Sequence, residues 1–228
     1  MKTVVLQSNY VPWRGYFQLI ATADTCIFYD DVQYTKNDWR NRNKILGPQG
    51  SEWITIPVGA GINRKIEEVQ LPSNNWREKH HQRILANYKK AECIEHLIPL
   101  LDLMYLTNQS KTLSEYNQEI ISEISRNYLE LNSSFSRSNL YKLSGSGANR
   151  LQDLLLQSGT TEYITGPAGL NYLSPLWFEE NQIKLTVFDY GNFRRYTQLF
   201  DFDEPYLSII DLIANVGKES PAFFRREN

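Results

Sequence analysis

The beginning of the chain alternates between two hydrophobic patterns, and this alternation limits the folds that are open to it. Residues 3–6 form a short apolar, β-branched run, which is typical of a buried strand. Apolar positions between residues 17 and 23 then follow helical spacing, and residues 25–29 form a second apolar run. Strand, helix and strand in this order predict a βαβ unit, from which parallel sheets are built.

The same alternation returns in the last third of the chain. The sequence there predicts strands at residues 134–140, 162–165 and 184–190, and helices at residues 148–157, 175–180 and 205–216, the last of them capped by Asp203. Residues 223–228 are expected to form a tail. The predicted fold class is α/β, with a Rossmann-like parallel sheet.

Residues 75–131 carry a helical pattern instead. Asn75 with Glu78, and Thr112 with Glu115, have the spacing of N-terminal capping boxes, and a helical run follows each pair. We therefore expect a helical insert or lobe at 75–131, with residues 1–74 and 132–228 forming the α/β core.

The segment between the first βαβ unit and this insert predicts a different kind of structure. It is expected to hold a basic loop at residues 36–44, a turn at 47–50, a strand at 53–58 and a short strand at 69–71.

Composition restricts the function classes further. The net charge of −2 provides no overall field for nucleic acid, which is therefore not expected as a partner. No run of about 18 apolar residues occurs, so no membrane insertion is expected. Cys26 and Cys93 stand in apolar contexts without ligand spacing, which predicts two buried thiols in a reducing compartment. We expect a cytoplasmic protein, and the sequence leaves a homodimer open.

Polar residues follow each of the first two predicted strands. Gln7, Asn9 and Tyr10 follow the first strand, and Asp30, Asp31, Gln33 and Tyr34 follow the second. Because ligands of parallel sheets bind beyond the carboxyl ends of the strands, both groups are predicted to belong to a binding site.

The residues Trp13, Arg14, Gly15 and Tyr16 stand where a strand turns into a helix. A helix N-terminus offers free amides and a partial positive charge, and Arg14 adds a guanidinium group suited to phosphate. Gly15 is explained equally well by close packing between strand and helix.

Asp30 and Asp31 admit several roles. The pair would hold Mg²⁺ or ribose hydroxyls, or one carboxylate would act as a general base. Because side chains alternate along a strand, only one of the two is expected to face the site. The alternative is a strand-end turn in which one Asp caps and the other is solvated.

A run of cations follows, with an aromatic and an amide residue among them: Lys36, Trp39, Arg40, Arg42, Asn43 and Lys44. The cations would bind a pyrophosphate, and Trp39 would stack on a base or sugar. A solvated charged loop explains the same run.

His80 and His81 are neighbours on a predicted helix, so they point about 100° apart and do not chelate one metal together. His80 is a candidate catalytic base, with a helix-surface histidine as the plainer alternative. His96 is assigned a structural role. No spacing in the sequence matches a zinc site, and no metal site is predicted.

Later motifs add candidates. Gly166, Pro167 and Gly169, with Tyr172, follow a strand and would wrap backbone amides around an anion or carbonyl, or form a plain turn. Residues 144–147 ahead of Arg150 are a second candidate anion site. Residues 189–190 and 196–198 stand at and beyond another strand end, where specificity residues would fit.

Several of these motifs together resemble the WbqC-like family. The resemblance lies in residues 7–17, 30–34, 39–43, 166–169, 172–173 and 188–190, and in Gln198, with Ser8 where the family's opening motif commonly has Pro. It implies a role in the biosynthesis of O-antigen, lipopolysaccharide or another surface polysaccharide. The activity implied is transfer of an acyl or aminoacyl group, such as glycine, to an amino sugar.

A weaker likeness links residues 12–34 to the opening of nucleotidylyltransferase-type Rossmann domains, including that of pantothenate synthetase. Those enzymes activate a carboxylate with ATP and pass it to an amine. Their HxGH motif is absent here, and Trp13 and Tyr16 stand at its histidine positions.

The leading hypothesis is an N-acyl or aminoacyl transferase, or an amide-forming ligase, acting on a nucleotide-linked amino sugar. Arg14, Arg40 and Arg42 would hold phosphate, Trp39 or Tyr34 would stack, and Asp31 or His80 would accept the amine proton. The acyl donor stays open between a thioester, an aminoacyl-tRNA and an acid activated by ATP with Mg²⁺. The alternatives are a non-catalytic nucleotide-sugar-binding protein of the same pathway and a metal-dependent glycosyltransferase.

Overall fold

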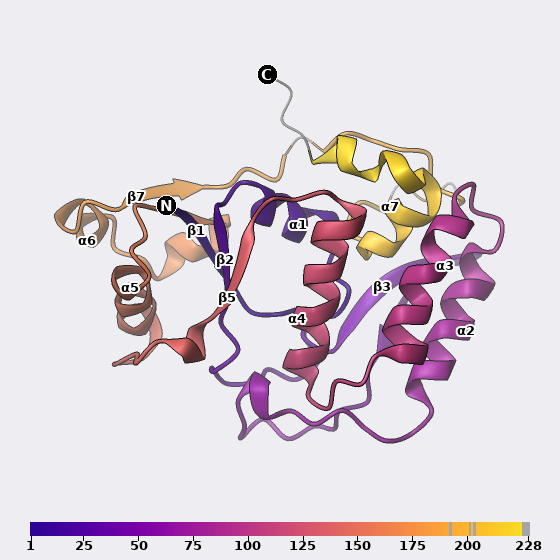
Figure 1. Ribbon diagram of the computed structural model, residues 1–228, viewed down its shortest axis with the longest axis horizontal. Helices are drawn as coiled ribbons and strands as arrows, with labels where there is room; N and C mark the ends of the chain where they lie inside the picture. Colours follow the sequence, from indigo (N-terminus) through magenta and orange to yellow (C-terminus); the bar gives the residue numbers. More distant parts are fainter. Residues whose placement is uncertain (192, 201, 203, 225–228) are drawn as a thin grey trace.

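The computed structural model describes residues 1–191, 193–200, 202 and 204–224, and its centre is a five-stranded parallel sheet (Figure 1). The strands are β1 (Lys2–Leu6), β2 (Thr25–Phe28), β5 (Ser134–Arg137), β6 (Glu162–Thr165) and β7 (Lys184–Val187). The predicted α/β class with a parallel sheet is confirmed.

Two of the strands are shorter than predicted. β5 ends at Arg137 and β7 at Val187, instead of continuing to residues 140 and 190. In the sheet Arg137 pairs with Phe28 and Val187 pairs with Thr165, and each partner is the last residue of its own strand. Because the partner strands end at these points, the chain leaves the sheet soon after them, and the last bond of this kind joins the Phe188 amide to the Thr165 carbonyl oxygen at 2.8 Å.

The strand order β5-β2-β1-β6-β7 places a topological switch point between β1 and β6. From β1 the chain adds strands on one side, through β2 to β5, and then returns to add β6 and β7 on the other side. β1 and β6 pair near their starts, Lys2 with Glu162 and Thr3 with Tyr163, whereas β1 and β2 pair as far as Leu6 and Phe28. A crevice at such a switch point is where open α/β sheets bind ligands.

Hydrophobic side chains cover both faces of the sheet, as expected for parallel strands with helices on each side. Val4 and Ile164 belong to the larger core cluster, whereas their neighbours Val5 and Tyr163 contact the smaller one. Because successive side chains point to opposite faces, β1 and β6 each contribute to both clusters.

Helices flank these two faces. α1 (Arg14–Ala21) packs in the larger cluster, and α5 (Gly147–Gln157) and α6 (Pro175–Glu180) pack in the smaller one. α1 begins earlier than the predicted residue 17, because the Tyr16 amide already donates to the Trp13 carbonyl oxygen at 3.0 Å.

The segment predicted to be helical contains α2 (Trp76–Tyr88), α3 (Ile94–Asp102) and α4 (Leu113–Glu123), and α3 and α4 each run on into a π-helical turn, Leu103–Thr107 and Ile124–Tyr128. α2 and α3 lie at the opposite end of the molecule from α5 and α6 (Figure 1). The division into a core and an insert at 75–131 stays a prediction.

One of the two predicted capping boxes is present. Thr112 Oγ1 accepts from the Glu115 amide at 3.2 Å, and the Glu115 carboxylate accepts from the Thr112 amide at 3.1 Å. The box at Asn75 was wrong: its backbone (φ −79°, ψ 29°) lies outside the extended region of an N-cap. The Asn74 side chain instead accepts from the Trp76 amide at 3.1 Å.

The predicted basic loop contains part of a strand. β3 (Arg42–Gly47) pairs with β4 (Gly50–Thr55) in an antiparallel hairpin, so residues 42–44 are strand, and β4 ends before residue 58. The alternation of buried Asn43 and half-buried Arg42 and Lys44 is the period of a strand, which the charge of the run concealed. Residues 69–71 form a single bridge, Gln70 with Thr112, instead of a strand.

The end of the chain is more ordered than predicted. α7 (Ile209–Val216) begins after Ser208, whose hydroxyl accepts from the Ile210 amide, and Asp203 lies outside the described residues. A 3₁₀ helix, Gly217–Phe223, follows, and the Phe223 carbonyl accepts from Gln18, so the expected tail does not begin at 223. Residues 225–228 lie outside the description.

Two further expectations concern thiols and membranes. Both cysteines are free; Cys26 is buried, as predicted, but Cys93 is only half-buried. Burial raises the pKa of the Cys26 thiol. Across the part of the chain that the structure describes, no helix is long and apolar enough to cross a membrane.

Candidate functional site

A cavity of about 810 Å³ lies at the switch point, beyond the carboxyl ends of β1 and β6. It is lined by the last residues of β1, the start of α5 and the loop after β6. The predicted site residues that it brings together are Gln7, Asn9, Trp13, Tyr16, Trp39, Arg40, Gly166, Gly169 and Tyr172.

Arg40 is the charged residue of this lining. Its Nη1 donates to the side-chain oxygen of Asn9, and its Nη2 lies 3.7 Å from the Asp38 carboxylate. Its Nε is buried and has no hydrogen-bond partner among the described residues. Asn9 and Asp38 thus orient the guanidinium group of a residue that lines the cavity.

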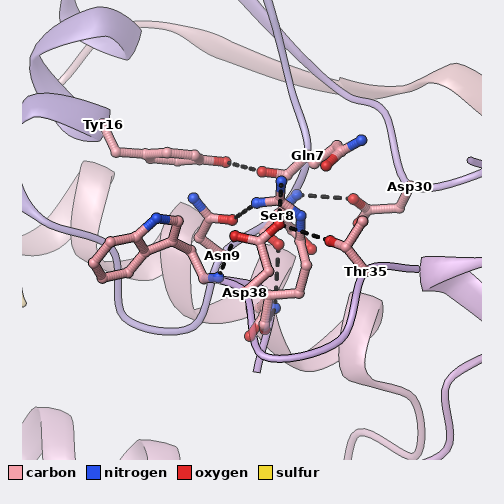
Figure 2. Close-up of polar contacts among 10 residues, drawn as sticks. Gln7, Ser8, Asn9, Tyr16, Asp30, Thr35 and Asp38 are labelled. Atoms are coloured by element: carbon pink, nitrogen blue, oxygen red, sulfur yellow. Dashed lines mark hydrogen bonds and ion pairs between the residues drawn. The ribbon is translucent and has the colours of Figure 1, made fainter. Parts of the chain in front are cut away.

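Tyr16 and Gln7 form the wall beside Arg40. The Tyr16 hydroxyl donates to the Gln7 backbone carbonyl oxygen at 3.1 Å (Figure 2). Burial raises the pKa of Tyr16 well above its usual value, so the phenol stays protonated and neutral. No described residue hydrogen-bonds the side-chain amide of Gln7, which makes this amide available to a ligand.

Trp13 explains why residue 15 is glycine. A Cβ atom at Gly15 would lie 2.4 Å from the Trp13 indole, which therefore folds back over the start of α1. The indole also packs against Tyr190, Phe193 and Tyr206, with ring centroids 5.3, 5.4 and 5.2 Å away. Gly15 therefore serves packing, one of the two explanations that the sequence left open, and does not itself line the cavity.

The N-terminus of α5 faces the cavity from the opposite side. Gly147 and Ala148 line it, and the preceding Ser146 makes no side-chain cap. The first amides of a helix carry partial positive charge and bind anions. The sequence flagged the glycine-rich run 144–147 as a second anion site; the structure places its end in the same cavity as Arg40.

The loop after β6 also lines the cavity, and it forms a 3₁₀ turn, Pro167–Asn171. A Cβ atom at Gly169 would lie 2.3 Å from Thr165 Oγ1, so only glycine fits there. The Tyr172 ring is 57% exposed at the edge of the lining and can stack on a planar ligand.

Asp30 and Asp31 do not line the cavity. Asp30 accepts from the Ser8 amide at 2.8 Å (Figure 2), from Ser114 at 2.5 Å and from Gln118 at 2.7 Å. Asp31 accepts from Ser138 and forms an ion pair with Arg150, at the first turn of α5. Both carboxylates are buried, contrary to the expectation that one is solvated or faces a ligand.

His80 also lies away from the cavity, in an aromatic cluster. Its Nδ1 is 2.7 Å from the Tyr10 hydroxyl, which is 2.5 Å from the Tyr105 hydroxyl. Burial lowers the pKa of His80 to about 4, so its imidazole is neutral near pH 7. His81, one residue on, points elsewhere and pairs with Asp102 at 2.9 Å.

The remaining predicted residues lie around the cavity without lining it. Arg14 faces a different cavity, Arg42 stacks on Trp53 with its Cζ 4.3 Å from the ring, and Tyr34 is buried under Arg64. Asn43 is buried and donates to the backbone carbonyl oxygens of Tyr10 and Val11. The side chains of Gln33 and Lys36 are exposed. Pro167 stands between the lining residues of its turn without lining the cavity itself.

The structure adds residues that sequence reasoning missed. Tyr29, Tyr163 and Thr165 line the cavity. Tyr29 follows the last residue of β2 and Thr165 is the last residue of β6, so their positions at strand ends were the available signal. The lining contains no Asp, Glu, His or Cys among the described residues. Nor does the described chain contain a group of three or more such residues that could hold a metal ion.

Residues 7–223 match the model of the WbqC-like protein family. The chain belongs to the WbqC-like family. It is 40% identical over 226 residues to the uncharacterized protein Rv1507c of Mycobacterium tuberculosis (strain ATCC 25618 / H37Rv), covering 98% of this chain and 97% of that protein. No solved structure matches the chain. The match to the family covers the lining of the switch-point cavity except for Val5 and Leu6.

Proposed function

We propose that the switch-point cavity binds a nucleotide-linked amino sugar and that the protein transfers an acyl or aminoacyl group to its amine. The observation that carries the binding half is the placement of the Arg40 guanidinium and the open N-terminus of α5 on one cavity. A phosphate or diphosphate between them would receive charge-assisted hydrogen bonds from both. Trp39 and Tyr172, both partly exposed, offer rings for the base or the sugar.

The transfer half rests on the family resemblance and on simple chemistry. The amine nitrogen attacks the carbonyl carbon of an activated acyl group, a carbon–nitrogen bond forms, and the bond to the leaving group breaks. The leaving group departs with the electron pair, and the amine loses one proton. A thioester, an aminoacyl-tRNA or an acid activated by ATP and Mg²⁺ would each supply such a group.

The lining bears on how the amine proton is lost. Asp31 and His80, the predicted bases, lie outside the cavity, and its described lining has no carboxylate or imidazole. We therefore assign Asp31 the role of holding α5 through Arg150, and we propose that the amine binds in its neutral form. The rate should rise with pH until the amine of the free substrate is mostly neutral.

The same observation favours one other function. A cavity whose described lining has binding groups but no carboxylate, imidazole or thiol is also what a non-catalytic nucleotide-sugar-binding protein needs. The two functions agree on the ligand and differ on turnover, so binding and reaction have to be measured separately.

Binding is tested by calorimetry with UDP- and dTDP-linked amino sugars. Arg40→Gln removes the charge that faces the cavity, and affinity should fall about tenfold or more, the size of a lost charge-assisted hydrogen bond. Arg83→Gln is the matched control, because Arg83 is an exposed arginine on α2 that pairs with Glu52. Equal affinity for the wild-type protein and the Arg40 variant would contradict the site.

Turnover is tested by mass spectrometry of the same sugars incubated with the protein, glycine, ATP and Mg²⁺, and in parallel with acyl thioesters and glycyl-tRNA. The proposed reaction predicts a mass increase equal to the acyl group added. Binding without any mass gain would reject the transferase and support the binding protein.

A further inference from the structure

A second cavity, of about 690 Å³, lies beside the first, and the two share a wall. Tyr190 lines both cavities, and Trp13, which lines the first, packs against Phe193 and Tyr206 of the second. A ligand in the second cavity would therefore lie one aromatic layer away from a ligand at the switch point.

Aromatic rings make up much of this second lining: Tyr190, Phe193, Tyr196, Phe200, Phe202 and Tyr206. The Phe202 and Tyr206 side chains are 42% and 56% exposed, so the cavity opens to solvent past rings that a planar ligand would cover. Such rings offer offset or edge-to-face stacking.

Arg14 contributes a buried cation to this aromatic lining. Only 8% of the residue is exposed, and its Cζ lies 4.4 Å from the centroid of the Phe193 ring. Its Nη1 donates to the Arg194 carbonyl oxygen at 2.6 Å, whereas its buried Nε has no partner among the described residues. No carboxylate of the described chain lies within ion-pair distance of Arg14.

The buried carboxylate of Asp211 does not neutralise Arg14 by contact. Asp211 accepts instead from Tyr88 at 3.0 Å, from Tyr196 at 2.6 Å and from Gln198 at 2.8 Å. Those bonds hold Tyr196 and Gln198 in the wall of the cavity. A buried guanidinium group without an anionic partner among the described residues is costly, and Arg14 lines a cavity that an anion can enter. Glu204, the described carboxylate of this lining, pairs with Lys44 at 3.5 Å.

We propose that this aromatic cavity is a second ligand site, for an organic anion in which a carboxylate or phosphate is attached to a planar ring. The anionic group pairs with Arg14, and the ring stacks among the aromatic side chains. This inference rests on the surroundings of Arg14 and does not require the proposed reaction. If the protein is a transferase, the two cavities place two substrates on opposite faces of the Trp13–Tyr190 layer.

Fluorine NMR on protein labelled with fluorotryptophan can locate such a ligand. Trp13 borders both cavities, whereas Trp39 lines only the first of these two. Benzoate and phenyl phosphate share a ring and differ in the anion, while acetate and inorganic phosphate lack the ring. We expect the ring-bearing anions to shift the Trp13 resonance and leave that of Trp39 in place, with the stronger binder identifying the anion.

Variants separate the two sites. Arg14→Gln should weaken binding of the ring-bearing anion about tenfold or more. Arg40→Gln should leave the affinity for that anion unchanged and weaken only the binding of the nucleotide sugar. Phe202→Ala, at an exposed ring, should also weaken binding of the ring-bearing anion. If Arg14→Gln does not fold, the Phe202 variant alone tests whether the anion binds in the second cavity. No shift with any probe, a shift of both tryptophans, or equal binding by acetate and benzoate would each overturn the proposal.

Discussion

Polar residues follow the ends of two adjacent strands, yet the two groups differ in what they are free to do. After β2, Asp30 is 3% exposed and accepts three hydrogen bonds from protein groups. After β1, no described residue hydrogen-bonds the side-chain amide of Gln7. Asn9, also after β1, orients Arg40, whose Nε has no hydrogen-bond partner among the described residues. The group after β2 is therefore saturated, in the sense that Asp30 has its hydrogen-bond donors within the protein. The group after β1 is unsaturated, because Gln7 and Arg40 keep atoms without a described partner.

The difference follows from the place of each strand in the sheet. β2 lies between β1 and β5, and α4 supplies Ser114 and Gln118 to the carboxylate at its end. β1 borders the switch point, where β6 pairs with it only near its start. Position at the switch point, more than polarity, separates the polar residues that line the cavity from those that are bonded within the protein.

The largest expected effect tests the saturated group. Asp30→Ala leaves three donors without an acceptor in a buried place, and it should lower the free energy of unfolding by about 4 kcal/mol. Urea unfolding at neutral pH measures this loss. Glu92→Ala, at an exposed carboxylate, is the control and should change stability by less than about 0.5 kcal/mol. A loss of the same small size for Asp30→Ala would mean that its hydrogen bonds contribute little.

The second prediction concerns His80, another group whose contacts are inside the protein. Its folded-state pKa, lowered to about 4 by burial, lies below the ordinary value of about 6.5. The unfolded chain therefore binds more protons between these values, so stability is complete above pH 6.5 and falls as the pH drops toward 4. The contribution of His80 to this fall should be about 3 kcal/mol.

Unfolding curves of the wild-type protein and of His80→Gln, measured at a series of pH values, isolate this contribution. Glutamine keeps a hydrogen-bonding group near the Tyr10 hydroxyl and cannot titrate. The two stabilities should converge as the pH falls. Parallel curves would show that His80 does not carry this pH dependence.

The sequence predicted the sheet well and the site in part, for one physical reason. Apolar periodicity predicts strands and helices, and it places strand ends, so Gln7 and Asn9 were found beside the cavity. Trp39 was found in another way, as an aromatic residue among cations. Periodicity does not tell which helix lies over which strand end. The two side-chain partners of Asp30, Ser114 and Gln118, are 84 and 88 residues away in the chain, and no local pattern could reveal them.

Arginines illustrate the same limit. The prediction was that Arg14, Arg40 and Arg42 would hold phosphate. In the structure Arg14 lines the second cavity and Arg40 the first, whereas Arg42 stacks on the Trp53 ring. Charge near a strand end predicted that arginines matter there. Their directions depend on the turn into α1 and on the pairing of β3 with β4, which are tertiary features.

The third prediction joins the two regions through Asp31 and Arg150. The pair ties the saturated end of β2 to the first turn of α5, whose amides face the cavity. A double-mutant cycle with Asp31→Ala and Arg150→Ala should give a coupling energy of about 2 kcal/mol in stability, as both side chains are largely buried. Asp31→Ala should also weaken binding of the nucleotide sugar, because α5 loses the ion pair that holds its first turn. A coupling energy near zero would leave α5 positioned by its apolar face alone.

The smallest effect is expected at the unsaturated edge of the cavity. Trp39 is 38% exposed and lines the cavity, so Trp39→Ala should leave stability nearly unchanged and weaken the nucleotide sugar about fivefold, the loss of one aromatic stack of about 1 kcal/mol. Trp53 is a matched control, because it is 43% exposed and its ring lies 5.3 Å from that of Trp39, but it does not line the cavity. If Trp53→Ala weakens binding equally, the tryptophan pair acts by ordering the β3–β4 hairpin. If only Trp39→Ala weakens binding, the Trp39 ring contacts the ligand, as expected of a partly exposed ring in the cavity lining.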